Sequence, residues 1–187
     1  VTFDFSKENS LEIHNNVAEP WKVTIVDTGL NTQTGGRIKR IKKYIANEIF
    51  MLTYGDGVCD VNIQELLNFH QKNKRLATLT AIQLGGRFGT LDINDDNNVI
   101  EQFAEKRKED GGWINGGYMV LEPQVLDYIE GDDTIFEKEP LERLSREGQL
   151  QAYRHNGFWQ CMDTMRDKQQ LERCLEHGAA PWKVWTD

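Results

Sequence analysis

The residue that most clearly suggests chemistry is Asp56, which stands between Gly55 and Gly57. The short apolar run 49–52 leads into it, and an unbroken apolar run closed by glycine is typical of a strand buried on both faces. We therefore expect Asp56 at the carboxyl end of a central strand, where open α/β sheets bind ligands. A carboxylate there could hold Mg²⁺ and, through it, phosphate groups. The alternative is a plain turn, because Asp and Gly are the commonest turn residues.

A second carboxylate, Asp163, follows Trp159 and starts the helix that we predict over residues 164–177. Two carboxylates far apart in sequence can share one Mg²⁺, with substrate phosphates and water completing its shell. That arrangement suits phosphoryl or nucleotidyl transfer, in which the protein mainly positions and neutralises charged groups. Taken alone, Asp163 could equally be the N-cap of its helix.

Three further stretches carry residue types that could contact an anionic substrate. Arg87 lies in the glycine-rich turn GGRFG, and Lys106 follows Glu105 after a predicted strand. Asn115 precedes a double glycine inside another predicted strand, and such glycines often mark the close approach of a ligand or another backbone. Each residue also has an ordinary alternative: a surface ion pair for Arg87, a solvated side chain for Lys106 and a turn position for Asn115.

The elements that must position these residues follow from hydrophobic periodicity. Runs of apolar and β-branched residues predict strands at 11–14, 21–26, 49–54, 76–84, 113–121 and 150–154, with a hairpin at 88–93 and 99–103. Helical spacing predicts helices at 37–45, 62–74, 123–129, 135–147 and 164–177, and Asn62 can cap the second of them. Because strands alternate with helices and no linker or repeat intervenes, we expect one α/β domain over residues 1–187, with a mostly parallel central sheet flanked by helices.

Composition narrows the class of partner. The net charge of −8 argues against a nucleic-acid or anionic-membrane surface, because either would need a basic footprint. No apolar run approaches transmembrane length, and no signal peptide is visible. Cys59, Cys161 and Cys174 show neither CxxC pairing nor metal-ligand spacing, so we expect reduced thiols in a cytoplasmic protein.

A series of stretches resembles the sugar-phosphate nucleotidyltransferases, and within them the glucose-1-phosphate cytidylyltransferase (CDP-glucose pyrophosphorylase) branch. In chain order they are VDTGLNTQTGGRIKRI, FMLTYGDGVCDV, GRFGTLDI, FAEKRKEDGGWINGGYMVL, EKEPLERL, GFWQCMDTMRDKQQLE and APWKVW. They cover most of the chain. The combination of VDTG, TGGR, GRFG and GFWQ followed by MDT is specific to the cytidylyl branch, as opposed to the thymidylyl and uridylyl enzymes.

The resemblance implies a Rossmann-like nucleotidyltransferase fold and a reaction in which the phosphate of α-D-glucose 1-phosphate attacks the α-phosphorus of CTP and releases pyrophosphate. It also implies Mg²⁺ as cofactor, and homo-oligomers, often hexamers, that make CDP-linked dideoxy sugars for bacterial surface polysaccharide such as O-antigen. The residues implied are Asp56 and Asp163 on the metal, Lys106 on the sugar phosphate, Glu105, Asn115, Gly116 and Trp159 around the sugar, Gly35 and Gly36 near the cytosine, and Arg87 in a loop near the site.

The chain also departs from the family pattern. The family opens with a strand and a GGxGTR loop that cradles the triphosphate, followed by a Pro-Lys-Pro stretch, and neither motif occurs here. The chain begins at Val1 without an initiator methionine, so we expect this sequence to be a piece of a longer protein. We also expect the piece to lack the N-terminal strand, which would leave one edge of the sheet uncovered.

Two local changes loosen rigid turns, because Arg107 and Cys161 stand where the family has proline. Because the phosphate loop and the segment on which base choice largely depends do not occur in this sequence, two alternatives to the cytidylyltransferase stay open at this point. One is a non-catalytic module that binds sugar phosphate or drives oligomerisation. The other is a related pyrophosphorylase that uses UTP or dTTP.

Overall fold

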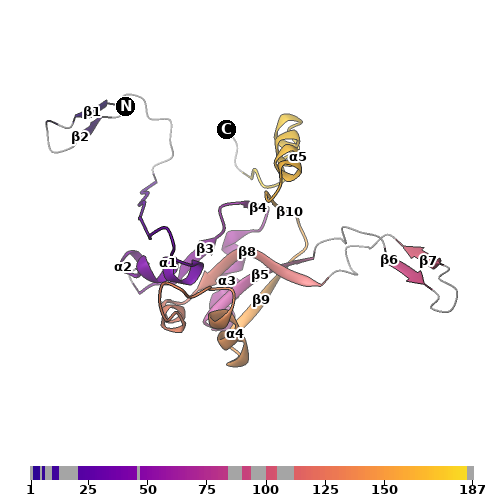
Figure 1. Cartoon of the computed structure of the whole chain (residues 1–187), viewed down its shortest axis with the longest axis horizontal. Helices are drawn as coiled ribbons and strands as arrows, with labels where there is room; N and C mark the ends of the chain where they lie inside the picture. Colours follow the sequence, from indigo (N-terminus) through magenta and orange to yellow (C-terminus); the bar gives the residue numbers. More distant parts are fainter. Residues whose placement is uncertain are drawn as a thin grey trace.

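A four-stranded sheet of order β3-β8-β5-β9 forms the centre of the computed structural model, which describes residues 2–4, 6, 10–12, 21–45, 47–83, 90–93, 100–104 and 112–184 (Figure 1). Its strands are β3 (Phe50–Thr53), β5 (Ala77–Gln83), β8 (Trp113–Leu121) and β9 (Leu150–His155). β8 runs antiparallel to both of its neighbours, and β5 and β9 are parallel. Three of the four strands therefore point the same way, and the predicted α/β class with a mostly parallel sheet is confirmed.

The strand before Asp56 is not central in this sheet. Within the described residues β3 pairs only with β8, and its side chains alternate between half-buried and exposed, with Met51 47% exposed. The prediction of a central strand buried on both faces is therefore wrong. An apolar run indicates burial but does not specify which strands flank it, and here one edge of β3 has no partner strand in the part of the chain that is described.

Helices pack on the sheet and around its ends. α3 (Ile63–Asn73) contacts β5 and β8, and α4 (Glu139–Arg146) contacts β9 and the 3-10 helix η2 (Pro123–Tyr128). The predicted helix at 37–45 is present as α1 (Thr34–Arg40) and α2 (Lys42–Ile45), which are in contact. α5 (Met165–Glu176) contacts β10 (Trp159–Cys161). Among these described helices, none combines the length and apolarity that crossing a bilayer requires.

Side-chain capping explains where two of these helices begin. The side chain of Asn62 accepts a hydrogen bond from the backbone N–H of Glu65, so the predicted cap of α3 is confirmed. α5 is capped by Thr164, which forms a reciprocal capping box with Asp167. Asp163 precedes that cap by one residue, so the alternative reading of Asp163 as the N-cap is wrong and its carboxylate is not used to start the helix.

The hydrophobic core lies where β8, η2 and α4 meet. Phe136, Leu144, Val125 and Leu121 are fully buried there. The other buried members of this core are Ile38, Ala77, Met119, Leu126, Ile129 and Leu141. All of these residues fall within strand and helix ranges predicted from the sequence, although Phe136 lies in the turn before α4 and Ile129 follows η2.

The remaining strands form two-stranded pairs. β4 (Gly57–Cys59) is antiparallel to β10, β1 (Thr2–Asp4) to β2 (Ser10–Glu12), and β6 (Thr90–Ile93) to β7 (Ile100–Ala104). The hairpins β1–β2 and β6–β7 lie apart from the sheet, on opposite sides of Figure 1. The hairpin predicted at 88–93 and 99–103 is thereby confirmed for its described residues.

One predicted strand is absent. Residues 21–29 form neither helix nor strand, and Trp21, Val23 and Ile25 are 78%, 72% and 93% exposed. The β-branched composition of this segment favours a strand, but a strand also needs a partner to satisfy its backbone, and no described strand pairs with it.

Candidate functional site

Asp56 and Asp163 lie at the same end of the β4–β10 pair. Gly57 stands opposite Cys161 in the register of that pair, and the backbone N–H of Met162 donates to the carbonyl of Asp56 at 2.7 Å. Asp163 follows directly, so the structure brings Asp56 and Asp163, both exposed, to one end of this antiparallel pair. Two exposed carboxylates on neighbouring backbone positions could serve Mg²⁺, which binds one or two carboxylates and keeps several waters.

The thiol of Cys161 takes part in this arrangement. Its Sγ donates to Oδ2 of Asp163 at 3.2 Å. Burial, and then the hydrogen bond to Asp163, raise the pKa of the Cys161 thiol above its usual value. The thiol of Cys161 therefore stays protonated at neutral pH and orients Oδ2 of Asp163. It makes no hydrogen bond to Oδ1 of the same carboxylate.

Trp159 and Gly116, both assigned to the sugar by the resemblance, are in direct contact. The indole Nε1 of Trp159 donates to the carbonyl of Gly116 at 2.7 Å, which docks β10 onto β8. A Cβ at Gly116 would lie 3.0 Å from the carbonyl oxygen of Thr80 and close to Ile82. The close approach of β8 and β5 therefore favours glycine at position 116, where a side chain would be tightly packed, and the carbonyl of Gly116 is available to the indole.

Asn115 belongs to a chain of hydrogen bonds that the sequence did not reveal. Its amide Nδ2 donates to the hydroxyl of Tyr54 at 3.2 Å, and that hydroxyl donates to Oε1 of Glu137 at 2.8 Å. Oε2 of Glu137 accepts from the hydroxyl of Thr34 at 2.6 Å. Burial, followed by the bond to Glu137, raises the pKa of Tyr54 far above its usual value, so its hydroxyl remains a donor.

Tyr54 and Glu137 are therefore positioning residues that sequence reasoning missed. Tyr54 immediately precedes the Gly-Asp-Gly turn, and Glu137 opens the stretch EKEPLERL, one of those that resemble the family. Their places next to these motifs were the signals by which the sequence could have pointed to both residues. Nothing in either segment indicates that the two side chains are in contact.

Gly35 and Gly36, in the first turn of α1, are buried against the loop 131–134. The backbone N–H of Gly35 donates to the carbonyl of Thr134 at 2.9 Å. A Cβ at Gly36 would lie 2.6 Å from the Cα of Asp132. Close backbone packing accounts for both glycines in the structure, and the cytosine contact implied by the resemblance stays a prediction.

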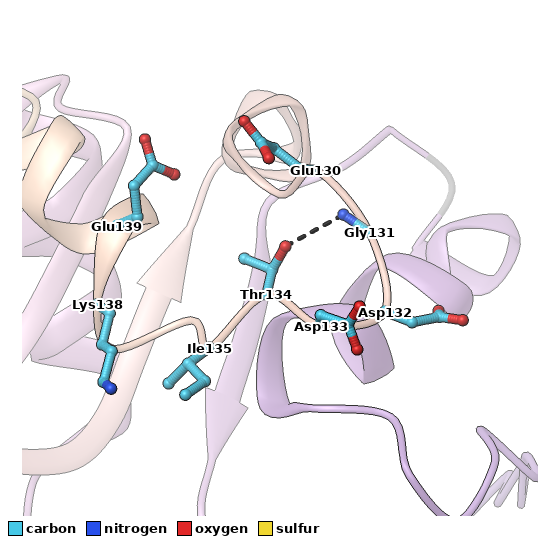
Figure 2. A pocket seen from close by; sticks show the side chains of 8 residues that line it. All are labelled: Glu130, Gly131, Asp132, Asp133, Thr134, Ile135, Lys138 and Glu139. Carbon is cyan, nitrogen blue, oxygen red and sulfur yellow. Dashed lines mark hydrogen bonds between the residues drawn. The ribbon is translucent and has the colours of Figure 1, made fainter.

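The same loop also lines a cavity of about 610 Å³ (Figure 2). Its acidic lining residues are Glu130, Asp132, Asp133 and Glu139, with Lys138 as its basic residue. The guanidinium of Arg40 holds Asp132 through two hydrogen bonds of 2.9 and 2.6 Å and lowers the pKa of that carboxyl. The net negative lining makes this cavity a poor place for a triphosphate.

Three residues of the predicted site lie outside the described residues, namely Arg87, Glu105 and Lys106. Arg107, which replaces a proline of the family pattern, lies there too. The structure neither brings these side chains to the carboxylates nor separates them, and their roles stay predictions.

Comparison with protein families and curated proteins gives consistent matches. A family model described as nucleotidyl transferase matches residues 5–185. The chain is 50% identical over 186 residues to the glucose-1-phosphate cytidylyltransferase of Salmonella typhimurium, which covers 99% of this chain and 71% of that protein. It is 41% identical to the probable glucose-1-phosphate cytidylyltransferase of Bacillus subtilis, over 96% of this chain and 73% of that protein.

Solved structures support the fold. HddC from Yersinia pseudotuberculosis superposes with a TM-score of 0.56 at 22% identity, covering 75% of this chain and 61% of that one. A UDP-glucose pyrophosphorylase complexed with UDP-glucose superposes with a TM-score of 0.59 at 13% identity, covering 82% of this chain and 65% of that one. The chain spans less than two thirds of either solved protein, and at these identities the likeness concerns the fold alone.

Proposed function

The chain belongs to the nucleotidyl transferase family, and we propose that it transfers the cytidylyl group of CTP to α-D-glucose 1-phosphate, giving CDP-glucose and pyrophosphate. Two of its relatives, 50% and 41% identical over nearly the whole chain, carry the names glucose-1-phosphate cytidylyltransferase and probable glucose-1-phosphate cytidylyltransferase, so the resemblance seen in the sequence is confirmed. The structural observation that carries the proposal is the hydrogen bond from Met162 to Asp56, which places the carboxylates of Asp56 and Asp163 at one end of the β4–β10 pair.

In the proposed reaction, a phosphate oxygen of the sugar forms a bond to the α-phosphorus of CTP. The bond from that phosphorus to the oxygen bridging the α- and β-phosphates breaks, and pyrophosphate leaves with the electron pair. Asp56 and Asp163 would hold Mg²⁺, which supplies charge neutralisation for the phosphates when bound. Lys106 would neutralise the sugar phosphate.

Trp159 and Gly116 would form a wall of the sugar site, and their mutual hydrogen bond keeps the wall in place. Asn115 would contact the sugar with its amide oriented by Tyr54. The other residues of the proposed site are Glu105 beside the sugar, Arg87 in a loop near the site, and Gly35 and Gly36 near the cytosine. Preorganised polar groups of this kind save the cost of reorganisation during the reaction.

The wider setting is part of the same proposal. CDP-glucose would feed the synthesis of CDP-linked dideoxy sugars for a surface polysaccharide such as O-antigen, in the cytoplasm. The protein would act as a homo-oligomer, up to a hexamer. One edge of β3 pairs with no strand of the described residues, which is compatible with self-association. The net charge of −8 is compatible with a small anionic substrate that Mg²⁺ neutralises.

Pyrophosphate release from CTP, glucose 1-phosphate and Mg²⁺ tests the proposal. Asp56→Asn and Asp163→Asn should each lower kcat by about 100-fold or more, because each removes a charged ligand of the Mg²⁺ that would neutralise the phosphates. Asp127→Asn is the matched control, since this exposed carboxylate pairs with Lys42 on α2, and its activity should be unchanged.

Two outcomes would contradict the proposal. Equal rates of pyrophosphate release with UTP or dTTP would show that the protein does not select CTP as its nucleotide. Binding of glucose 1-phosphate by calorimetry without any pyrophosphate release would identify a non-catalytic binding module instead.

A further inference from the structure

A second cluster of potential metal ligands lies at the other end of the β4–β10 pair. The thiol of Cys59, the carboxylate of Asp60 and the imidazole of His155 have ligand atoms that all lie within 4.8 Å of one another. Cys59 ends β4, and His155 ends β9. The spacing of the cysteines alone predicted no metal site, because the third ligand is a histidine 95 residues away from Asp60 in the chain.

We propose that Cys59, Asp60 and His155 bind one borderline-soft divalent cation of the zinc class. A thiolate and an imidazole suit Zn²⁺ and its neighbours in the first transition series, whereas Mg²⁺ prefers oxygen ligands alone. The site is therefore chemically distinct from the carboxylates of Asp56 and Asp163. Three protein ligands with a fourth position left open is a common arrangement for zinc.

The present distances are close to those that such an ion needs. Nε2 of His155 lies 2.8 Å from Oδ1 of Asp60. Zinc–ligand distances of about 2.0–2.3 Å in a tetrahedron separate neighbouring ligand atoms by about 3.2–3.8 Å. Entry of the cation therefore requires these two groups to part by about 0.5 Å, and the proton between them to leave.

Backbone packing holds the carboxylate and the imidazole in place. The N–H of Phe158 donates to Oδ1 of Asp60 at 2.7 Å. A Cβ at Gly157 would lie 2.7 Å from Cε1 of His155 and would also collide with Oδ1 of Asp60, so only glycine fits directly over the pair. Within the described residues Oδ2 of Asp60 accepts no hydrogen bond, which leaves that oxygen for a cation.

The cluster is also accessible. Cys59 and Asp60 line a cavity of about 790 Å³ whose walls include Val61, Tyr118 and Trp182. His155 and Asp60 are 12% and 28% exposed. A cation can thus reach Cys59 and Asp60 from the cavity, and water from the same side can complete a tetrahedral shell.

A bound cation would link two parts of the site. His155 leads through residues 156–158 into β10, which carries Trp159 and ends just before Asp163, and Cys59 belongs to the partner strand β4. The cation would fasten β4 to the start of this segment. It would therefore stabilise the strand pair that presents the carboxylates.

Titration with Co²⁺, which replaces zinc and is visible in absorption spectra, tests the proposal on the whole chain after treatment with a chelator. We expect stoichiometric uptake with a thiolate-to-cobalt charge-transfer band, displacement by Zn²⁺, and no displacement by millimolar Mg²⁺. The absence of such a band in the folded protein would overturn the proposal. This readout is independent of pyrophosphate release, so it can succeed or fail whatever the outcome of the activity assay.

Variants identify the ligands. Cys59→Ser and His155→Gln should weaken Co²⁺ binding by more than the roughly 10–100-fold that loss of an outer-shell partner costs. The control is Cys174→Ser on α5, which should bind Co²⁺ like the unaltered chain. Unchanged binding in the first two variants would overturn the proposal. If either variant fails to fold, X-ray absorption of the zinc-loaded unaltered protein decides: one sulfur among nitrogen and oxygen ligands supports the site, and a shell without sulfur refutes it.

Discussion

The region around β8, η2 and α4 and the β4–β10 pair are held together by different forces. In the first region Phe136, Leu144 and Val125 are fully buried, whereas no residue of β4, β10 or the turns that follow them is fully buried. The pair is fixed by directional bonds, such as the indole of Trp159 to the carbonyl of Gly116 and the hydroxyl of Tyr118 to the carbonyl of Gly57. Apolar burial therefore supplies most of the stability, and a few hydrogen bonds place the carboxylates.

Truncating the core should produce the largest loss of stability. Phe136→Ala removes a fully buried ring and should lower the free energy of unfolding by about 3–5 kcal/mol, measured by urea denaturation. Met165→Ala, on the site side in α5, removes a side chain that is 66% exposed and should change it by less than about 0.5 kcal/mol. Similar losses of unfolding free energy in the two variants would show that apolar burial stabilises both regions to the same extent.

A methyl group at Gly36 should destabilise the scaffold at the contact between α1 and the loop 131–134. Its Cβ would lie 2.6 Å from backbone atoms of Asp132, so Gly36→Ala should cost about 1–3 kcal/mol in unfolding experiments. Gly131→Ala is the control, because no atom lies within 4 Å of the added Cβ. A loss confined to CTP affinity, with stability unchanged, would instead indicate a direct nucleotide contact.

Tyr54→Phe tests the link between the two regions. The hydroxyl is the hydrogen-bonding partner of both Glu137 and Asn115, so its removal should cost about 1–2 kcal/mol of stability. It should also raise the KM for glucose 1-phosphate, because the amide of Asn115 loses its anchor. Tyr128→Phe removes a similar bond to Glu147 far from the carboxylates and should leave KM unchanged. An equal KM for glucose 1-phosphate in the two variants would show that Tyr54 has no part in binding the sugar.

The smallest predicted effect is a pH dependence that belongs to the buried region. His70 is 1% exposed, with Nδ1 2.7 Å from Oγ1 of Thr78 and Nε2 3.4 Å from Oε1 of Glu122. Burial lowers the pKa of His70, and the charge of Glu122 opposes this only in part. Because the lowered pKa belongs to the folded state, stability is complete above the ordinary histidine pKa of about 6.5 and is lost as the pH falls below it.

The slope of this loss should not exceed about 1.4 kcal/mol per pH unit, which is the value for a single proton. Urea denaturation at pH values on both sides of that pKa measures it. His70→Gln should flatten the curve, whereas His177→Gln at the exposed end of α5 should not. A slope that persists in His70→Gln would assign it to other groups.

Local sequence determined the elements of this protein. The strand predicted at 113–121 has the bounds of β8, and Asn62 caps α3 as expected, because alternation of apolar residues and capping depend on neighbours within a few positions. The motifs also identified the family, whereas the sharing of one metal ion by Asp56 and Asp163 stays a prediction. What local sequence could not determine was pairing: among the described residues, no strand pairs with residues 21–29, and β3 pairs with β8 alone.

Only the tertiary structure decided which distant side chains meet. The register of β4 against β10 places Asp56 beside Met162, and the chain from Asn115 through Tyr54 to Glu137 joins three separate segments. The cluster of Cys59, Asp60 and His155 likewise depends on where β9 ends relative to β4. The physical reason is that periodicity specifies the faces of each strand and helix, whereas the contacts between elements depend on the packing of the whole chain.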